Sequence, residues 1–145
     1  MTSIGRQAAQ PANLIRAAVL ALFVIPAPAQ AVEQFSCVVD RFLPSGDDAT
    51  FAAKNARKTF DLLVKKDEII AFVRSKDFKN SETRYQIIDR GTLDMVAIET
   101  NISGLSSLVL PVNPASRLKS DGYFNATISL QSRSFINTWL LRCVE

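Results

Sequence analysis

The composition of this chain restricts the chemistry that it can perform, because it contains two cysteines and no histidine. Without histidine there is no Ser-His-Asp or Cys-His nucleophilic site and no imidazole general base. The usual zinc and copper ligand sets are also missing. The five glycines are not clustered, so no glycine-rich loop is available to cradle a phosphate. We therefore expect no cofactor and no metal centre.

Carboxylates are the remaining candidates for acid and base catalysis, because a pair of them can hydrolyse a glycosidic bond. The residues considered are Asp61, Asp67, Glu68, Asp89, Asp94 and Glu99. Asp67 and Asp89 belong to predicted turns. Asp61 and Asp94 fall on the polar side of alternating strands, where a solvated surface explains them more simply. We expect no enzyme, with a glycan hydrolase as the less favoured alternative.

The first 31 residues have the pattern of a secretory signal peptide. A polar stretch with two arginines precedes the apolar run 17–25, and Ala29-Gln-Ala31 offers the small residues that a signal peptidase reads. A membrane span is the alternative, but a span needs about 20 apolar residues, and here nine are uninterrupted. We expect residues 1–31 to be cleaved and residues 32–145 to form one domain in the periplasm or outside the cell.

The basic charge of the chain belongs partly to this leader. The whole chain has 17 Lys and Arg against 14 Asp and Glu, and Arg6 and Arg16 are the charged residues of the leader. Subtracting these two leaves 15 against 14, a net charge of +1. This balance gives no electrostatic argument for binding nucleic acid or an anionic membrane, so we expect no nucleic-acid partner.

An exported location favours a disulfide bond between the two cysteines, Cys37 and Cys143. Disulfides persist in oxidising compartments, and an even number of cysteines in a small exported chain is typical of a disulfide framework. We expect an intramolecular Cys37–Cys143 bond that fastens the first strand to the last. Two unpaired buried thiols, or a bond between two chains, are the alternatives.

Alternating apolar and polar residues indicate the strands that position these side chains. A short helix over 49–58, capped by Asp47 or Asp48, is expected after the first strand. Gly91 is expected to supply a positive φ in a hairpin turn. The predicted strands are 35–39, 59–65, 68–75, 83–89, 92–100, 105–110, 123–131 and 135–143.

Eight short strands joined by nearest-neighbour turns predict an all-β fold, a small antiparallel up-and-down barrel. Closure requires the first and last strands to pair, which removes both exposed sheet edges. A β-sandwich is the alternative. We expect a monomer whose interior is mostly filled by side chains, with Trp139 in the core.

Two regions are candidates for contact with a partner. Phe78 is an apolar residue in a charged loop, and the long loop 111–122 could bind a partner or form an ordinary connection stiffened by prolines. The possible contact residues are Phe78, Pro111, Pro114, Arg117 and Lys119.

The segments Phe35-Ser-Cys-Val-Val39, just beyond the leader, and Phe135-Ile-Asn-Thr-Trp-Leu-Leu-Arg-Cys143, at the end, form a plan that resembles the VirK family. These are small exported proteins of plant- and animal-associated proteobacteria, and the resemblance implies an accessory, virulence-associated part in host interaction. The plan is also similar to that of periplasmic inhibitors of c-type lysozyme, which are small barrels with terminal cysteines. Their Ser-Gly-x-x-Tyr and Thr-Lys-Gly motifs are absent, since Leu105, Ser106 and Ser107 follow Ser103-Gly104, so no site residue is carried over.

Together these patterns predict a non-catalytic exported binding or accessory protein that acts through its surface or through one mouth of the barrel. Its partner would be a protein or a glycan outside the cytoplasm. A carrier of a small apolar ligand and an inhibitor of a lytic enzyme are the alternatives.

Overall fold

The structure is a computed structural model of the chain, and it describes residues 32–101, 104–114 and 120–145. The predicted signal peptide, residues 1–31, lies outside the described residues. So do Arg117 and Lys119, two of the predicted partner contacts.

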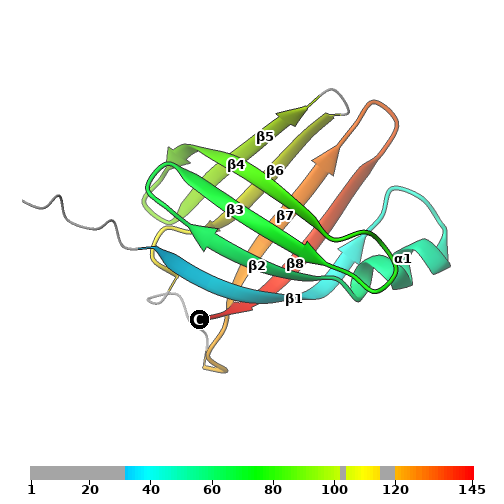
Figure 1. Cartoon of the computed structure of the whole chain (residues 1–145), viewed down its shortest axis with the longest axis horizontal. Coiled ribbons are helices and arrows are strands. Elements are labelled where there is room, and N and C mark those ends of the chain that lie inside the picture. Colours follow the sequence, from blue (N-terminus) through cyan, green and yellow to red (C-terminus); the bar gives the residue numbers. More distant parts are fainter. Residues whose placement is uncertain (1–31, 102–103, 115–119) are drawn as a thin grey trace, which may run out of the picture.

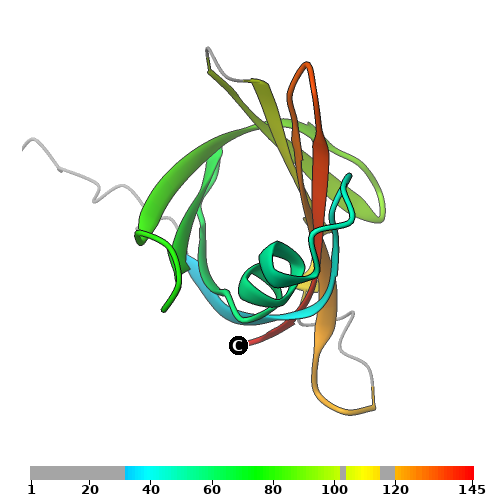
Figure 2. The same ribbon diagram turned by 90° about the vertical axis from the view of Figure 1, so that its right-hand side faces the viewer.

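The described strands close into an antiparallel barrel in which each strand pairs with its neighbours in the sequence and the first pairs with the last (Figure 1). The predicted eight-stranded barrel is confirmed, and the sandwich alternative is wrong. Figure 2 looks into the ring that the strands form. The strands are β1 (Glu33–Leu43), β2 (Thr59–Val64), β3 (Glu68–Arg74), β4 (Ser81–Arg90), β5 (Asp94–Asn101), β6 (Gly104–Pro111), β7 (Phe124–Gln131) and β8 (Ile136–Val144).

The alternation in each strand sends every second side chain into the barrel, where apolar residues from all eight strands form one core. The strand β3 is apolar on both faces, and its pairing decides which face turns inward: Ile69 lies opposite the buried Tyr85 of β4. The largest fully buried apolar side chains include Leu62, Ile69, Met95, Leu108, Leu110 and Phe124.

The two cysteines form an intramolecular disulfide inside this core, as predicted. Cys37 of β1 and Cys143 of β8 are directly paired across the closing strands, with their Cα atoms 4.0 Å apart. Both are almost fully buried. The bond therefore joins the two strands that close the barrel.

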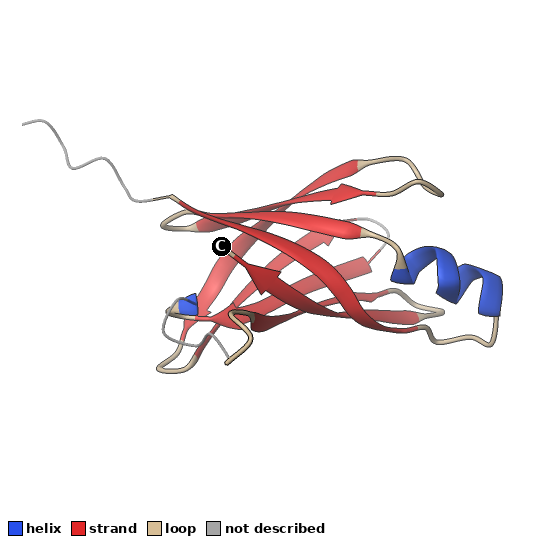
Figure 3. Cartoon of the chain, turned by 90° about the horizontal axis from the view of Figure 1, so that it is seen from below, coloured by secondary structure: helices blue, strands red, loops and turns tan. Residues whose placement is uncertain are grey.

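The helix α1 (Ala49–Ala56) follows β1 and lies at the end of the barrel opposite to the C-terminus (Figure 3). Its alanines favour a helix, and the Asp48 carboxylate caps it by accepting a hydrogen bond from the Phe51 N–H at 2.9 Å. The ring of Phe51 packs against Phe42 of β1, with centroids 5.9 Å apart. The predicted helix is confirmed, and α1 is fixed to the barrel mouth by an aromatic contact.

The prediction that Gly91 has a positive φ is wrong. The positive-φ glycines among the described residues are Gly104 and Gly122. The loop between β4 and β5 spans three residues and is closed by a 3.0 Å hydrogen bond from the Gly91 N–H to the Asp94 carbonyl, and Gly91 adopts this turn without a positive φ.

Replacing Gly104 with alanine should destabilise the barrel by about 1–3 kcal/mol, the range for overpacking. Gly104 has a φ of +156°, and a Cβ there would collide with the main-chain carbonyl of Gln131 on β7. The matched control is Gly46→Ala, whose Cβ would meet nothing within 4 Å. Thermal unfolding of both variants tests this prediction, and equal effects at the two sites would contradict it.

Candidate binding site at the helix end of the barrel

Polar side chains gather at the α1 end of the barrel interior. On β5 the inward positions run from the buried Met95 and Ala97 to Glu99, and on β6 they run from Leu110 and Leu108 to Ser106. Glu99 and Ser106 lie opposite each other in the pairing of the two strands. The interior therefore changes from apolar to polar towards α1.

A cavity of about 240 Å³ lies at this end, and we call it the helix-end cup. It combines hydrogen-bonding groups, one ammonium and one carboxylate with an apolar wall. Its polar lining consists of Lys58, Ser81, Thr83, Tyr85, Glu99, Asn101 and Ser106. Its apolar lining consists of Phe60, Val73, Ile128, Leu130 and Trp139.

Tyr85 and Ser106 form the floor of the polar part. Their hydroxyls are 2.9 Å apart and hydrogen-bonded, and both residues are buried. Burial raises the pKa of the Tyr85 hydroxyl, the bond to Ser106 acts against this, and the nearby Glu99 carboxylate raises it further. Tyr85 is therefore a neutral hydrogen-bonding group at physiological pH.

We expect Tyr85 to ionise only above the usual tyrosine pKa of about 10, because burial disfavours the phenolate. The chain has two tyrosines, so absorbance titration of a Tyr123→Phe variant reports Tyr85 alone. Because the pKa of Tyr85 is higher in the folded state than in the unfolded state, its ionisation at high pH destabilises the fold. This contribution to stability is fully present below about pH 10 and is lost as the pH rises through the folded-state pKa. The Tyr85→Phe variant should not lose stability over this alkaline pH range. Ionisation of the folded protein at or below pH 10 would contradict the prediction.

Glu99 supplies the carboxylate of the cup. It accepts two hydrogen bonds from the Asn101 side-chain amide, at 2.9 and 3.1 Å. None of the ion pairs among the described residues includes Glu99. Its charge is thus held in place by a neutral amide.

Lys58 supplies the cation, from the short segment between α1 and β2. Its ammonium lies 4.6 Å from the ring centroid of Phe78 and 5.0 Å from that of Trp139. Burial lowers the pKa of Lys58, and Lys58 takes part in no ion pair within the described part of the chain. Two aromatic rings therefore hold a partly desolvated ammonium at the rim of the cup.

Trp139 is part of the core, as predicted, and is 7% exposed. Its ring centroid is 5.0 Å from that of Phe42 and 6.4 Å from that of Phe60. Its indole N–H is buried without an acceptor among the described residues. These neighbours and the Lys58 ammonium leave little of the ring open for stacking on a ligand.

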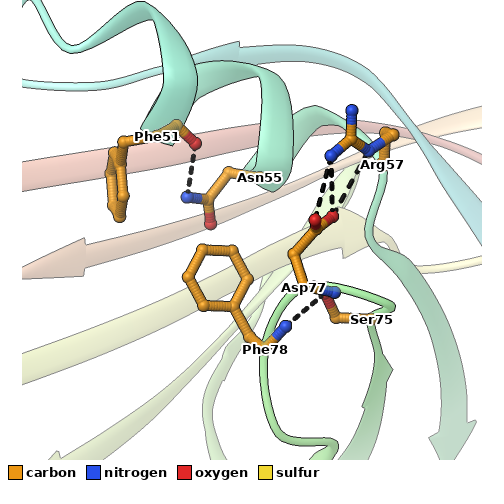
Figure 4. Close-up of polar contacts among 6 residues, drawn as sticks. All are labelled: Phe51, Asn55, Arg57, Ser75, Asp77 and Phe78. Atoms are coloured by element: carbon orange, nitrogen blue, oxygen red, sulfur yellow. Dashed lines mark hydrogen bonds and ion pairs between the residues drawn. The ribbon is translucent and has the colours of Figure 1, made fainter.

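The rim of the cup is braced by contacts of α1 and its C-cap residue, Arg57, with the loop after β3 (Figure 4). The Arg57 guanidinium donates three hydrogen bonds of 2.9–3.3 Å to the Asp77 carboxylate. The Phe78 ring packs edge-on against Phe51 at 6.3 Å. The Ser75 hydroxyl accepts a 3.1 Å hydrogen bond from the main-chain N–H of Phe78. The helix and this loop therefore form one side of the mouth.

The predicted contact residues do not share one site. Phe78 lies at the rim of the helix-end cup and is 37% exposed. Pro111 ends β6 at the other end of the barrel, and Pro114 is buried. Their contact with a partner stays a prediction.

The sequence predictions missed the polar cup itself. The alternation along the strands did contain a signal for it. Ser106 is an even number of residues from Leu108 and Leu110, and Glu99 is an even number from Met95, so each shares the inward face of its strand. Glu99 is the one carboxylate among the described residues that line the cup. A hydrolase mechanism that uses two facing carboxylates would need a second acid that this cup does not show.

A larger cavity, of about 370 Å³, lies on the outer side of the barrel along β1, β2 and β8. Two of the three charged side chains that line it have partners of opposite charge: Arg142 pairs with Asp40 at 3.1 Å, and Asp61 pairs with Arg74 at 2.7 Å. The third, Asp121, accepts a 3.5 Å hydrogen bond from the Ser120 hydroxyl. The helix-end cup is smaller, yet its two charges are unpaired among the described residues. We therefore take the cup as the candidate site.

Comparisons with known proteins add no assignment: no family model, no curated protein and no solved structure matches the chain. Within the described residues, no group of three or more Cys, Asp or Glu side chains is placed to hold a metal ion. The same residues contain no helix with the length and hydropathy of a membrane-spanning helix. The function must therefore be argued from the cup.

Proposed function

We propose that this chain is an exported, non-catalytic binding protein that acts through the helix-end cup. The observation that carries the proposal is the convergence of hydroxyls, an amide, an ammonium and a carboxylate on one cavity of an otherwise apolar interior. Such groups weaken a hydrophobic core when they lack partners. They are typical of a site that orients a ligand.

The disulfide supports the proposed location outside the cytoplasm, because such bonds persist in oxidising compartments. The signal-peptide pattern of residues 1–31 supports the same location. In this proposal the protein is a monomer whose partner, a protein, a glycan or a small molecule, presents a polar group to the cup. The resemblance to the VirK family would make this an accessory role in host interaction.

Native mass spectrometry of the protein, purified gently from the exported fraction, tests the proposal. Ser106→Leu should fill the cup and abolish a bound species, because Ser106 faces the cavity. Ser107→Leu is the matched control, because the next residue on β6 faces the other side of the strand. If the wild type carries nothing, the measurement is repeated after incubation with periplasmic and host extracts.

Binding that survives Ser106→Leu would place the site elsewhere and contradict the proposal. The proposal is also contradicted if, after both incubations, no species binds the wild type and is lost in Ser106→Leu. Circular dichroism of each variant shows that the barrel has folded.

A carrier of a small apolar ligand is the second candidate, and the apolar wall of the cup favours it. Phe60, Ile128 and Leu130 line this wall. A lipid or another apolar compound that co-purifies with the wild type and is lost in Ser106→Leu would support the carrier.

A further inference from the structure

We infer that the helix-end cup binds a zwitterion of amino-acid size, with the ligand carboxylate at Lys58 and the ligand ammonium at Glu99. The inference rests on the proposed function, because it names the ligand class of the same cup.

The two charges lie on different sides of the barrel ring. Lys58 directly precedes β2 and lies over Trp139 of β8, whereas Glu99 belongs to β5. In the closed order of strands, β5 is three strands away from both β2 and β8 (Figure 2). A ligand that enters the cup between them therefore meets a cation on one side and an anion on the other.

Each charge lacks a partner of opposite sign among the described residues. Two aromatic rings hold the Lys58 ammonium, and the Asn101 amide holds the Glu99 carboxylate. Taking a charge out of water costs free energy unless it is paired. A ligand with only an anion would pair with Lys58 and meet repulsion from Glu99. A zwitterion pairs with both charges at once.

The size and the walls of the cup favour an amino acid over a sugar. At about 240 Å³, the cup is smaller than the usual range of roughly 300–1,000 Å³ for drug-sized ligands. Phe60, Ile128 and Leu130 offer an apolar surface to an aliphatic side chain. Stacking on a sugar would need an open aromatic face, and the ring of Trp139 is covered by Phe42 and Lys58.

Isothermal titration calorimetry of the disulfide-bonded protein with L-alanine, L-valine and L-leucine tests the inference. We expect at least one of them to bind. N-acetyl-L-leucine lacks the ammonium and L-leucinamide lacks the carboxylate, so each should bind about tenfold or more weakly than L-leucine, the loss expected when one charged hydrogen-bonding partner is removed. D-glucose should not bind.

Charge-removing variants assign the two ends of the ligand. Lys58→Gln and Glu99→Gln should each weaken the binding of L-leucine about tenfold or more. Lys58→Gln should also remove the preference for L-leucine over L-leucinamide. The matched controls are Lys76→Gln and Glu82→Gln, two exposed residues outside the cup, and they should bind like the wild type. Thermal unfolding confirms that each variant is folded.

Equal affinities for L-leucine and N-acetyl-L-leucine would overturn the role of Glu99. No binding of any amino acid, in a titration that detects a Kd of about 1 mM, would overturn the inference. If a different species then binds the wild type and not Ser106→Leu, the zwitterion is wrong and the proposed function stands. If binding is insensitive to Ser106→Leu, the proposed function fails too.

Discussion

Replacing both Cys37 and Cys143 with alanine should lower the free energy of unfolding by about 4 kcal/mol, because the bond closes a very long loop of chain. The cysteines are 106 residues apart in the sequence, and the bond ties the two strands whose pairing closes the barrel. Without it, the unfolded chain gains conformational entropy. Equilibrium urea unfolding of the variant and the wild type measures the difference.

Reduction of the wild type under the same conditions provides the control. Reduced wild type and the double variant should unfold at similar urea concentrations, and added reductant should not affect the double variant. The slope of the unfolding free energy against urea should rise, because an unlinked unfolded chain exposes more surface. A loss below about 1 kcal/mol would contradict the chain-entropy argument.

Phe124→Ala should destabilise the protein by about 3–5 kcal/mol, the range for removing a fully buried aromatic side chain. Phe124 is 1% exposed and packs edge-on against Phe35 with ring centroids 5.0 Å apart. It also lies opposite Cys143 in the pairing of β7 with β8. The truncation therefore leaves a cavity next to the disulfide, where rigid strands limit relaxation. Urea unfolding measures the loss.

The matched control for this prediction is Phe72→Ala. Phe72 lies on β3, where it follows the inward-facing Ala71, and it is 38% exposed. Since less apolar surface is returned to water and no enclosed cavity forms, its loss should be about 1 kcal/mol or less. Similar losses of stability for the two variants would mean that Phe124 of β7 does not face the core or that Phe72 of β3 does.

Strand periodicity predicted the barrel, yet it placed the ends of the strands less well. The first strand was predicted to end at Val39, but β1 continues to Leu43, past an irregularity between Val39 and Arg41 that shifts the register against β8. Beyond it, Phe42 lies opposite Trp139. A shift of this kind breaks the period of two, so the pattern alone could not follow the strand through it.

The sequence by itself determined the faces of the alternating strands, the helix after the first strand and the only intramolecular disulfide that two cysteines allow, whereas the inward face of β3, which is apolar on both sides, was left to the pairing with β4. These follow from local periodicity and from counting, and neither needs a partner strand. The tertiary structure decided the binding cup. Lys58, Tyr85, Glu99 and Trp139 are far apart in the sequence, and closure of the sheet brings them to one mouth. Local rules show which face a side chain takes, but the register around a closed ring decides what it meets there.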